Sequence, residues 1–344
     1  MNQTHCAPRA VLTAFALTTA VLLPGHAARA ATLVVGPGQS YTTIAAAVAA
    51  AQDGDTVQVM AGTYVNDFAD IQHNITLTAV GGRVVMRATG YIPNEKGILV
   101  ADADLTVTGF SFMGAKVTNA AGGNGAGIRY DSGNMAINDC YFAYNQNGIL
   151  ANAWPGATIT ITSSEFYDNG VADGPSSGST HNIYINEVAT LDIENSYFHG
   201  AQVGHEIKSR ADTTIVRNTR VVDGPNGTAS YSIDLPNGGV ATIENDKIEQ
   251  GPLSQNPLII AFGEEGNLHA GSALTVSANW IDNDLNSPDA VAVWNAGGAP
   301  TTVTGNSVYG LVAAQMLHGV GTLSDTTYLK IEPKFGNFHP WSPP

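Results

Sequence analysis

The sequence predicts an all-β fold in which one chain coils into a solenoid of stacked parallel strands. Two observations lead to this prediction. A six-residue segment with an aliphatic first residue and an apolar sixth residue recurs eight times, and a second short apolar segment precedes seven of the copies. The connections between them are rich in glycine, asparagine and aspartate and leave no room for a crossover helix, as a ribbon of stacked strands requires.

The six-residue segment defines the coil. Its copies are VTGFSF, INDCYF, ITSSEF, IENSYF, VRNTRV, IENDKI, VSANWI and VTGNSV, between Val107 and Val308. They begin 23 to 33 residues apart. Such variation fits a solenoid, because an insertion can leave the coil as a loop on one side. The fourth position, occupied by Cys140 in the second copy, is predicted to form an interior ladder.

The N-terminal stretch SYTTIAAAVAAAQDGDTVQVMAGTY (residues 40–64) predicts one Ala-rich helix followed by a strand. Ile44 and Val48 share a helical face, which would cover the open end of the first coil. This opening resembles that of the right-handed parallel β-helix proteins of the pectate-lyase-like superfamily, and the resemblance runs through roughly residues 33–310. It implies a single-stranded right-handed parallel β-helix with an N-terminal capping α-helix, and it says little about chemistry.

The ends of the chain suggest three segments. Arg9, an apolar run at residues 10–24 and a small-residue ending at residues 28–30 are typical of a signal peptide. We therefore expect a signal peptide at 1–30, a β-helix domain at 31–320 and a C-terminal tail or cap at 321–344. The protein is then secreted or periplasmic, and no stretch approaches the ~20 apolar residues of a membrane span.

Charge and cysteine content narrow the classes of partner. Loss of Arg9 and Arg29 with the signal peptide takes the formal net charge from −15 to −17. Such an acidic surface argues against nucleic acid as a partner. The mature chain keeps only Cys140, which excludes an internal disulfide and a cysteine-rich metal site. We expect a monomer that binds an acidic polysaccharide.

The stacked apolar segments place specific side chains on the outside. If Ile128, Ile149, Ile183, Ile207 and Ile233 stack inward, strand alternation turns the next residue of each outward. This predicts an outward column of Arg129, Leu150, Tyr184, Lys208 and Asp234, and beside it a column of Asp131, Asn152, Asn186, Arg210 and Pro236. Because coils are ~4.8 Å apart, Tyr184, Lys208 and Asp234 become neighbours.

A third column lies two positions before the inward isoleucines and contains Asn147, His181, His205 and Tyr231. Simple alternation points these side chains inward, where they form a polar stack. One irregular residue at the strand entry would instead turn two imidazoles and a phenol toward Lys208. Both orientations remain open at this stage.

This patch suits the chemistry of uronic acids. Removal of the proton at carbon 5 needs a base and a cation that neutralises the adjacent carboxylate. We expect Lys208 to be the base, with His205 or His181 as alternatives, Arg210 to neutralise the carboxylate, and Tyr231 or Tyr184 to donate the proton. Clustered cations would lower the pKa of Lys208. The substrate-contacting residues are expected to be Tyr184, Asn186, Asp234, Arg129 and Glu206.

The segment HEIKSRADTTIVRN also resembles the E-I-x-x-K-S…N segment of chondroitinase-B-like and alginate lyases, β-helices with a lysine base and a downstream arginine. The match is partial: Lys208 directly follows Ile207, Arg210 comes two residues later, and the family's Arg-His-Gly is replaced by YSIDLPNGG. The resemblance implies a polysaccharide lyase that cleaves a uronic-acid-containing polymer by β-elimination.

Several alternatives stay open. A carbon-5 epimerase shares the proton abstraction, and a non-catalytic polysaccharide-binding scaffold needs only the fold. Lys208 and Arg210 also fit a structural salt-bridge ladder with Glu206 and Asp234. We expect no cofactor and no metal; the alternative is calcium, bound by Asp282, Asp284 and Asp289 or by Glu264 and Glu265.

Overall fold

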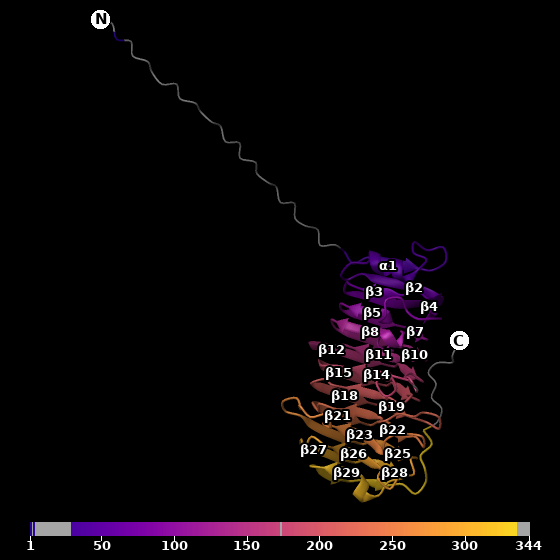
Figure 1. Ribbon diagram of the computed structural model, residues 1–344, viewed down its shortest axis with the longest axis vertical. Helices are drawn as coiled ribbons and strands as arrows, with labels where there is room; N and C mark the ends of the chain where they lie inside the picture. The colour runs from indigo at the N-terminus through magenta and orange to yellow at the C-terminus, as the bar shows by residue number, and fades with distance from the viewer. Residues whose placement is uncertain (2, 4–28, 173, 336–344) are drawn as a thin grey trace.

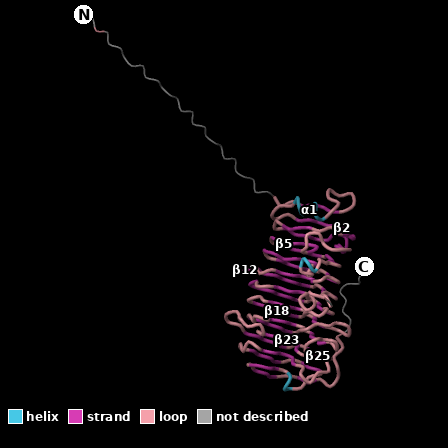
Figure 2. Tube along the Cα trace, in the orientation of Figure 1, coloured by secondary structure: helices cyan, strands magenta, loops and turns pink. Residues whose placement is uncertain are grey.

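The chain forms an elongated stack of parallel coils, as predicted (Figure 1). The computed structural model describes residues 1, 3, 29–172 and 174–335. Nearly all of the expected signal peptide lies outside the described residues. The fold is a right-handed parallel β-helix, and each complete coil adds one strand to each of three parallel ladders, here called A, B and C. Figure 2 shows the strands of successive coils side by side.

Ladders A and B belong to one 21-stranded sheet, because the long strands β2 and β4 run through both; ladder C is a separate 10-stranded sheet. Ladder A consists of β1 (Thr32–Val35), β2 (Thr56–Val65), β4 (Ile75–Arg87), β6 (Leu105–Thr108), β9 (Met135–Asn138), β12 (Trp154–Thr162), β15 (Val188–Glu194), β18 (Thr213–Arg217), β21 (Val240–Glu244), β24 (Ala273–Ser277), β27 (Thr301–Thr304) and β30 (Thr322–Ser324).

The other two ladders follow in the same order along the chain. Ladder B adds β7 (Phe110–Met113), β10 (Tyr141–Ala143), β13 (Glu165–Tyr167), β16 (Tyr197–His199), β19 (Arg220–Val222), β22 (Lys247–Gln250), β25 (Trp280–Asn283), β28 (Ser307–Tyr309) and β31 (Thr327–Tyr328). Ladder C consists of β3 (Ala69–Ile71), β5 (Gly97–Asp102), β8 (Ala126–Ser132), β11 (Asn147–Ala151), β14 (Ile183–Ile185), β17 (Ile207–Ser209), β20 (Ile233–Leu235), β23 (Leu258–Phe262), β26 (Val291–Asn295) and β29 (Leu317–Gly319).

The recurring six-residue segment is the corner between ladders A and B. Its third residue has left-handed backbone geometry in all eight copies, at Gly109, Asp139, Ser163, Asn195, Asn218, Asn245, Ala278 and Gly305. Glycine adopts this geometry without strain, and short polar residues tolerate it better than others do. One such residue turns the chain sharply from one strand into the next, which explains the small and amide residues at this position.

The fourth residue of the segment points inward and links the coils. The backbone N–H of one such residue donates to the side chain of the residue at the same position one coil later, at 2.7 to 3.2 Å. The series runs from Cys140 through Ser164, Ser196, Thr219, Asp246 and Asn279 to Asn306. We call this set the inner ladder. The predicted interior position of Cys140 is confirmed. The sixth position stacks Phe112, Phe142, Phe166 and Phe198, with ring centroids 4.5 to 5.0 Å apart.

The N-terminal end of the stack is covered by α1 (Ile44–Ala50), as predicted. Thr43 caps the helix by accepting a hydrogen bond from the Ala46 N–H at 3.3 Å. Ile44 and Val48 are buried against the first coil. The two 3-10 helices are η1 (Asn119–Ala121) and η2 (Ala313–Gln315).

At the other end, β30 and β31 continue the stack to Tyr328, beyond the boundary expected at residue 320. Within the part of the chain that the structure describes, no helix combines the length and the apolar character needed to cross a membrane.

Candidate active site

The outer face of ladder C carries the predicted column of charged and aromatic side chains. Tyr184 of β14, Lys208 of β17 and Asp234 of β20 are paired in register on successive coils. The inward column is confirmed as well: Ile128, Ile149, Ile183, Ile207 and Ile233 are in register and fully buried.

Two cations of this face hold one carboxylate between them. Lys208 Nζ lies 3.2 Å from Glu265 Oε1, and Arg210 Nη2 lies 2.6 Å from Glu265 Oε2. Arg210 also donates from Nε to the Tyr184 hydroxyl at 2.9 Å and from Nη1 to Asn237. Lys208 Nζ makes a second ion pair with Asp234 Oδ2 at 2.6 Å. We call Tyr184, Lys208, Arg210, Asp234 and Glu265 the charged cluster.

The electrostatics of Lys208 differ from the sequence-based expectation. Burial lowers the pKa of Lys208, but Asp234 and Glu265 more than offset this effect and raise it above its ordinary value. The expectation that neighbouring cations lower this pKa is wrong, because the carboxylates of Asp234 and Glu265 contact the amine and stabilise its protonated form. Lys208 is therefore an ammonium at neutral pH.

A second carboxyl group keeps its proton beside Asp234. Burial and a hydrogen bond with Asp234 raise the pKa of Glu264 to about 9. Burial alone would raise the pKa of Asp234 too, but His205, Glu264 and Lys208 together lower it. Asp234 Oδ1 and Glu264 Oε2 have no other hydrogen-bond partner among the described residues. The pair thus consists of an ionised Asp234 and a protonated Glu264.

The third column forms a stack of rings on the side of the outward column, where His205 contacts Asp234 and the ring of His181 lies 5.7 Å from that of Tyr184. The rings of His181 and His205 lie 4.8 Å apart, and those of His205 and Tyr231 lie 4.9 Å apart. His181 Nδ1 accepts the His205 N–H at 3.0 Å, and His205 Nδ1 accepts the Tyr231 N–H at 3.2 Å. Both histidines are buried, at 4% and 7% exposure.

These bonds decide what the histidines can do. A backbone amide only donates, so Nδ1 of each ring is the acceptor and has no free lone pair for a substrate proton. His205 Nε2 instead lies 3.1 Å from Asp234 Oδ2. Burial, together with His205 and Lys208, holds the pKa of His181 well below its usual value. The geometry makes His205 a positioning residue for Asp234 rather than a base.

Other predicted residues fall into three groups. Glu206 is fully buried, and its carboxylate accepts from the Ala201 N–H and from Asn182, so its predicted contact with substrate is wrong. It lies on the inner side because the chain turns just before β17. Arg129 faces the same side of ladder C as Lys208 but three coils away, where it donates to Asn152. Asn186 lies half-buried at the end of β14, next to the coil of Arg210.

Sequence reasoning missed the role of the loop after β23. The sequence suggested Glu264 and Glu265 only as calcium ligands, whereas Glu265 contacts two cations and Glu264 forms a hydrogen bond with Asp234. Gly263 and Gly266 flank the pair, both with left-handed geometry. The Gly-Glu-Glu-Gly pattern was visible, but it lies outside the repeated segments and therefore could not be aligned to a coil.

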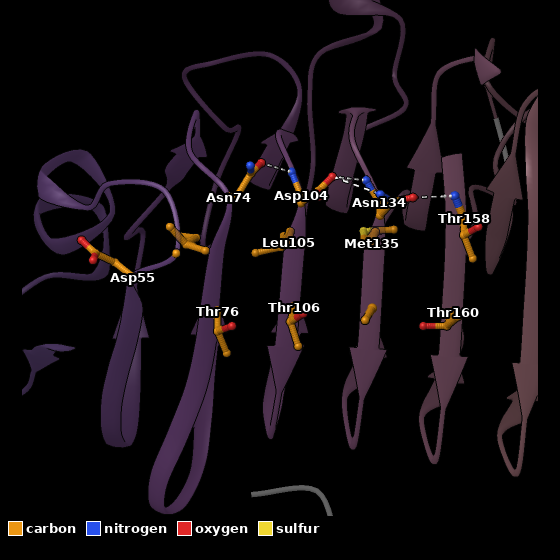
Figure 3. A pocket seen from close by; sticks show the side chains of 13 residues that line it. Asp55, Asn74, Thr76, Asp104, Leu105, Thr106, Asn134, Met135, Thr158 and Thr160 are labelled. Carbon is orange, nitrogen blue, oxygen red and sulfur yellow. Dashed lines mark hydrogen bonds between the residues drawn. The ribbon is translucent and has the colours of Figure 1, made fainter. Parts of the chain in front are cut away.

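A surface hollow lies near the N-terminal end of the stack. It has a volume of about 360 Å³ and runs across ladder A, where Thr76, Thr106 and Thr160 face it (Figure 3). Its ionisable members, Asp55 and Asp104, accept backbone N–H groups, Asp104 from Asn134 at 2.6 Å. The lining of the hollow includes no Lys, Arg or His, so it offers no cation for a uronate carboxylate, and the charged cluster is the better candidate.

Comparisons with known proteins agree on the fold. No family model and no curated protein matches the chain. Among solved structures, an alginate lyase from Paenibacillus sp. str. FPU-7 is similar, with a TM-score of 0.55 and 18% sequence identity, covering 87% of this chain and 99% of that chain. Pectate lyase Pel9A has a TM-score of 0.45 and 15% identity, over 88% of this chain and 79% of that chain. The chain has a right-handed parallel β-helix fold similar to that of the Paenibacillus alginate lyase.

Proposed function

We propose that the protein is a polysaccharide lyase that cleaves a uronic-acid-containing polymer by β-elimination at the charged cluster. One observation carries this proposal: Lys208 and Arg210 together hold the carboxylate of Glu265, whose side chain is 46% exposed. A uronate carboxylate presents the same two oxygens to the same two cations. The similar alginate lyase acts, by its name, on a polyuronate, which agrees with this substrate class.

In the proposed reaction, the uronate replaces Glu265 on Lys208 and Arg210. Neutralising its carboxylate acidifies the proton at carbon 5. A base takes that proton, the electron pair forms the double bond between carbons 4 and 5, and the bond from carbon 4 to the glycosidic oxygen breaks. The departing oxygen takes a proton from an acid, so the atoms balance without a cofactor.

Lys208 and Tyr184 are the two groups placed to exchange these protons. Asp234 and Glu265 raise the pKa of Lys208 and so favour the ammonium, which is the form that can donate a proton. We therefore assign Lys208 as the acid and Tyr184 as the base, which exchanges the roles expected from the sequence. In this step Tyr184 first gives its hydroxyl proton to solvent, the phenolate takes the proton from carbon 5, and the Lys208 ammonium protonates the departing oxygen. The Tyr184 oxygen already accepts from Arg210 Nε at 2.9 Å, which fixes its position beside the bound carboxylate.

The proposal is tested by incubating the purified full chain with alginate, polygalacturonate, hyaluronan, chondroitin sulfate and dermatan sulfate. We expect ultraviolet absorbance from an unsaturated uronate on one of them. Proton exchange at carbon 5 without cleavage would indicate an epimerase, and binding with neither reaction would indicate a scaffold; either result contradicts the lyase assignment.

Two variants separate the roles within the cluster. Tyr184→Phe is expected to lower kcat by about 100- to 10,000-fold with little change in KM, as loss of a general base does. Lys208→Arg is expected to keep KM near that of the parent, because the cation remains. If Tyr184→Phe is active and Lys208→Arg is as inactive as Lys208→Ala, the base is Lys208.

A further inference from the structure

A second cluster of ionisable groups lies on ladder B, on a different sheet from the charged cluster. Glu249 of β22 is in register with Asp282 of β25, and Asp284 follows two residues later. Glu332, from the chain beyond β31, reaches the same place. One oxygen from each of Asp282, Asp284 and Glu332 lies within 4.8 Å of the others. The C-terminal segment therefore completes an acidic cluster that begins on the β-helix.

These groups line one cavity. Asp282, Asp284, Glu332 and Glu249 share a cavity of about 220 Å³, whose wall also includes Arg220 and Lys334. Four carboxylates thus face two cations in a confined space. The two cations leave the cavity with an excess of negative charge when the acids are ionised.

The buried member of the cluster lacks a partner. Asp282 is only 2% exposed, and its Oδ1 has no hydrogen-bond partner among the described residues. A buried carboxylate oxygen normally accepts hydrogen bonds or binds a cation, because leaving it unpaired is unfavourable. Asp282 lies instead among the acidic groups of Asp284, Glu249 and Glu332.

We propose that Asp282, Asp284 and Glu332 form a calcium site that fastens the C-terminal segment to β25. The ligand set consists of carboxylate oxygens, which hard cations prefer, and it contains no histidine or cysteine for zinc. Calcium takes six to eight oxygens in flexible geometry, which ligands from two separate stretches of chain and added waters can supply. Magnesium demands a tighter octahedron. Glu249 lies beside the site and adds negative charge.

The proposed site differs in its third ligand from the calcium alternative that the sequence suggested. That alternative grouped Asp282 and Asp284 with Asp289. Asp289 is exposed and is not part of the cluster, whereas Glu332, 50 residues from Asp282 in sequence, is. Only the return of the chain after β31 brings the third carboxylate into place.

The test uses the full chain, stripped with a chelator and dialysed, and calcium chloride as the probe at pH 8. We expect one calcium ion per chain by titration calorimetry and a higher thermal midpoint with calcium than with chelator. Calcium should also slow trypsin cleavage after Lys330, which precedes Glu332 by two residues. None of these measurements involves a sugar, so they stand apart from the lyase assay.

Three variants locate the ion. Asp284→Asn and Glu332→Gln should each weaken calcium binding by roughly 10- to 100-fold and remove its effects on melting and trypsinolysis. Without calcium both should melt no lower than the parent, because each removes a repelling charge. Asp289→Asn is the matched control and should behave as the parent does.

Three results would overturn the site. The first is no calcium uptake by the parent chain, which would mean that Arg220, Lys334 and bound protons suffice. The second is calcium uptake that both Asp284→Asn and Glu332→Gln leave intact. The third is equal stabilisation by magnesium and calcium, which would overturn the choice of metal.

Discussion

Asp234 and Asp246 are both fully buried aspartates, yet their surroundings change their acidity in opposite directions. Asp246, in the inner ladder, accepts one hydrogen bond from the Thr219 N–H at 2.7 Å, and burial raises its pKa to about 8. Asp234, in the charged cluster, contacts Lys208 and His205, and its pKa is lowered despite the same burial. Cationic partners, not depth, decide the charge of a buried carboxyl group.

The two regions are also built differently. In the inner ladder each coil supplies one short polar side chain at a corner fixed by one left-handed residue, so the pattern repeats. The charged cluster combines β14, β17 and β20 with a loop after β23 that has no counterpart in other coils. Repetition produces neutral hydrogen-bonded structure, and the loop after β23 produces a place where charge is exposed.

Among the variants that test this contrast between the two regions, the largest effect is expected from removing the cation that binds Glu265 and Tyr184. Arg210→Ala should lower kcat/KM on the polyuronate substrate by about 100- to 1,000-fold, the range for losing a group that stabilises a developing oxyanion. The expected measurement is initial rate of unsaturated-uronate formation, with circular dichroism to confirm the β-structure.

Arg217→Ala is the matched control for this prediction. Arg217 lies at the end of β18 on ladder A and is paired with Asp192 at 3.7 Å, away from the charged cluster. It should retain the parent rate. An equal loss of rate in both variants would mean that the rate depends on the total positive charge of the β-helix surface. The charged cluster would then have no special role in catalysis.

The second prediction concerns Asp246. Its folded pKa of about 8 exceeds the ordinary value of 3.8, so between these values the folded chain holds a proton that the unfolded chain has lost. This group therefore makes stability fall as pH rises from about 4 to 8. Asp246→Asn removes the penalty, because asparagine fits the ladder at Asn279 and Asn306.

We expect Asp246→Asn to match the parent at pH 4 and to be more stable at pH 9 by roughly 2–5 kcal/mol. Denaturant midpoints at the two pH values measure this, and other titrating groups cancel in the difference. Asp234→Asn should do the reverse, since its lowered pKa contributes stability above pH 3.8 that is lost as pH falls below it. A destabilised Asp246→Asn at pH 9 would contradict the assignment.

The inner ladder could be predicted from the sequence because its corner segment recurs in successive coils. Aligning the corner segments was enough to place Cys140 and the inward isoleucines, and strand alternation was enough to place Tyr184, Lys208 and Asp234 on one face. The contact of Glu265 with the two cations could not be predicted, because residues in loops follow no sequence period. Sequence reasoning also misplaced Glu206, since alternation fails at the turn into β17.

The same limit explains the error over the pKa of Lys208. The sequence showed cations close together along the chain, and their mutual repulsion predicted a lowered pKa. The acids that reverse the shift come from other coils, Asp234 from the next and Glu265 from a later loop. Electrostatics depend on distance in space, which a linear count of charges cannot supply.

The third prediction tests whether Glu265 competes with substrate. Glu265→Gln removes the charge that now occupies Lys208 and Arg210, so we expect KM for the polyuronate to fall by about 3- to 10-fold with kcat little changed. Glu264→Gln is the control, because Glu264 is already uncharged at neutral pH. An unchanged KM in the Glu265→Gln variant would mean that the substrate carboxylate does not take this position.

The smallest expected effect concerns the left-handed corner position that precedes the inner ladder. Ala278 occupies the left-handed corner position where earlier coils have Asn218 and Asn245, at a φ of 57°. A Cβ-bearing residue is strained there by about 1–2 kcal/mol, and asparagine tolerates the geometry best after glycine. Asn245 already donates to Asn218 at 2.6 Å, so Ala278→Asn can extend this outer row by one coil.

Ala278→Asn should therefore raise the free energy of unfolding by about 0.5–1 kcal/mol, measured as a shift in denaturant midpoint with an unchanged slope. Ala278→Gly should gain less, because glycine also loses more freedom on folding. Neither change should affect activity, since this corner lies between ladders A and B. A gain in the glycine variant that exceeds the asparagine gain would show that backbone strain alone, without the asparagine row, sets the stability of the corner.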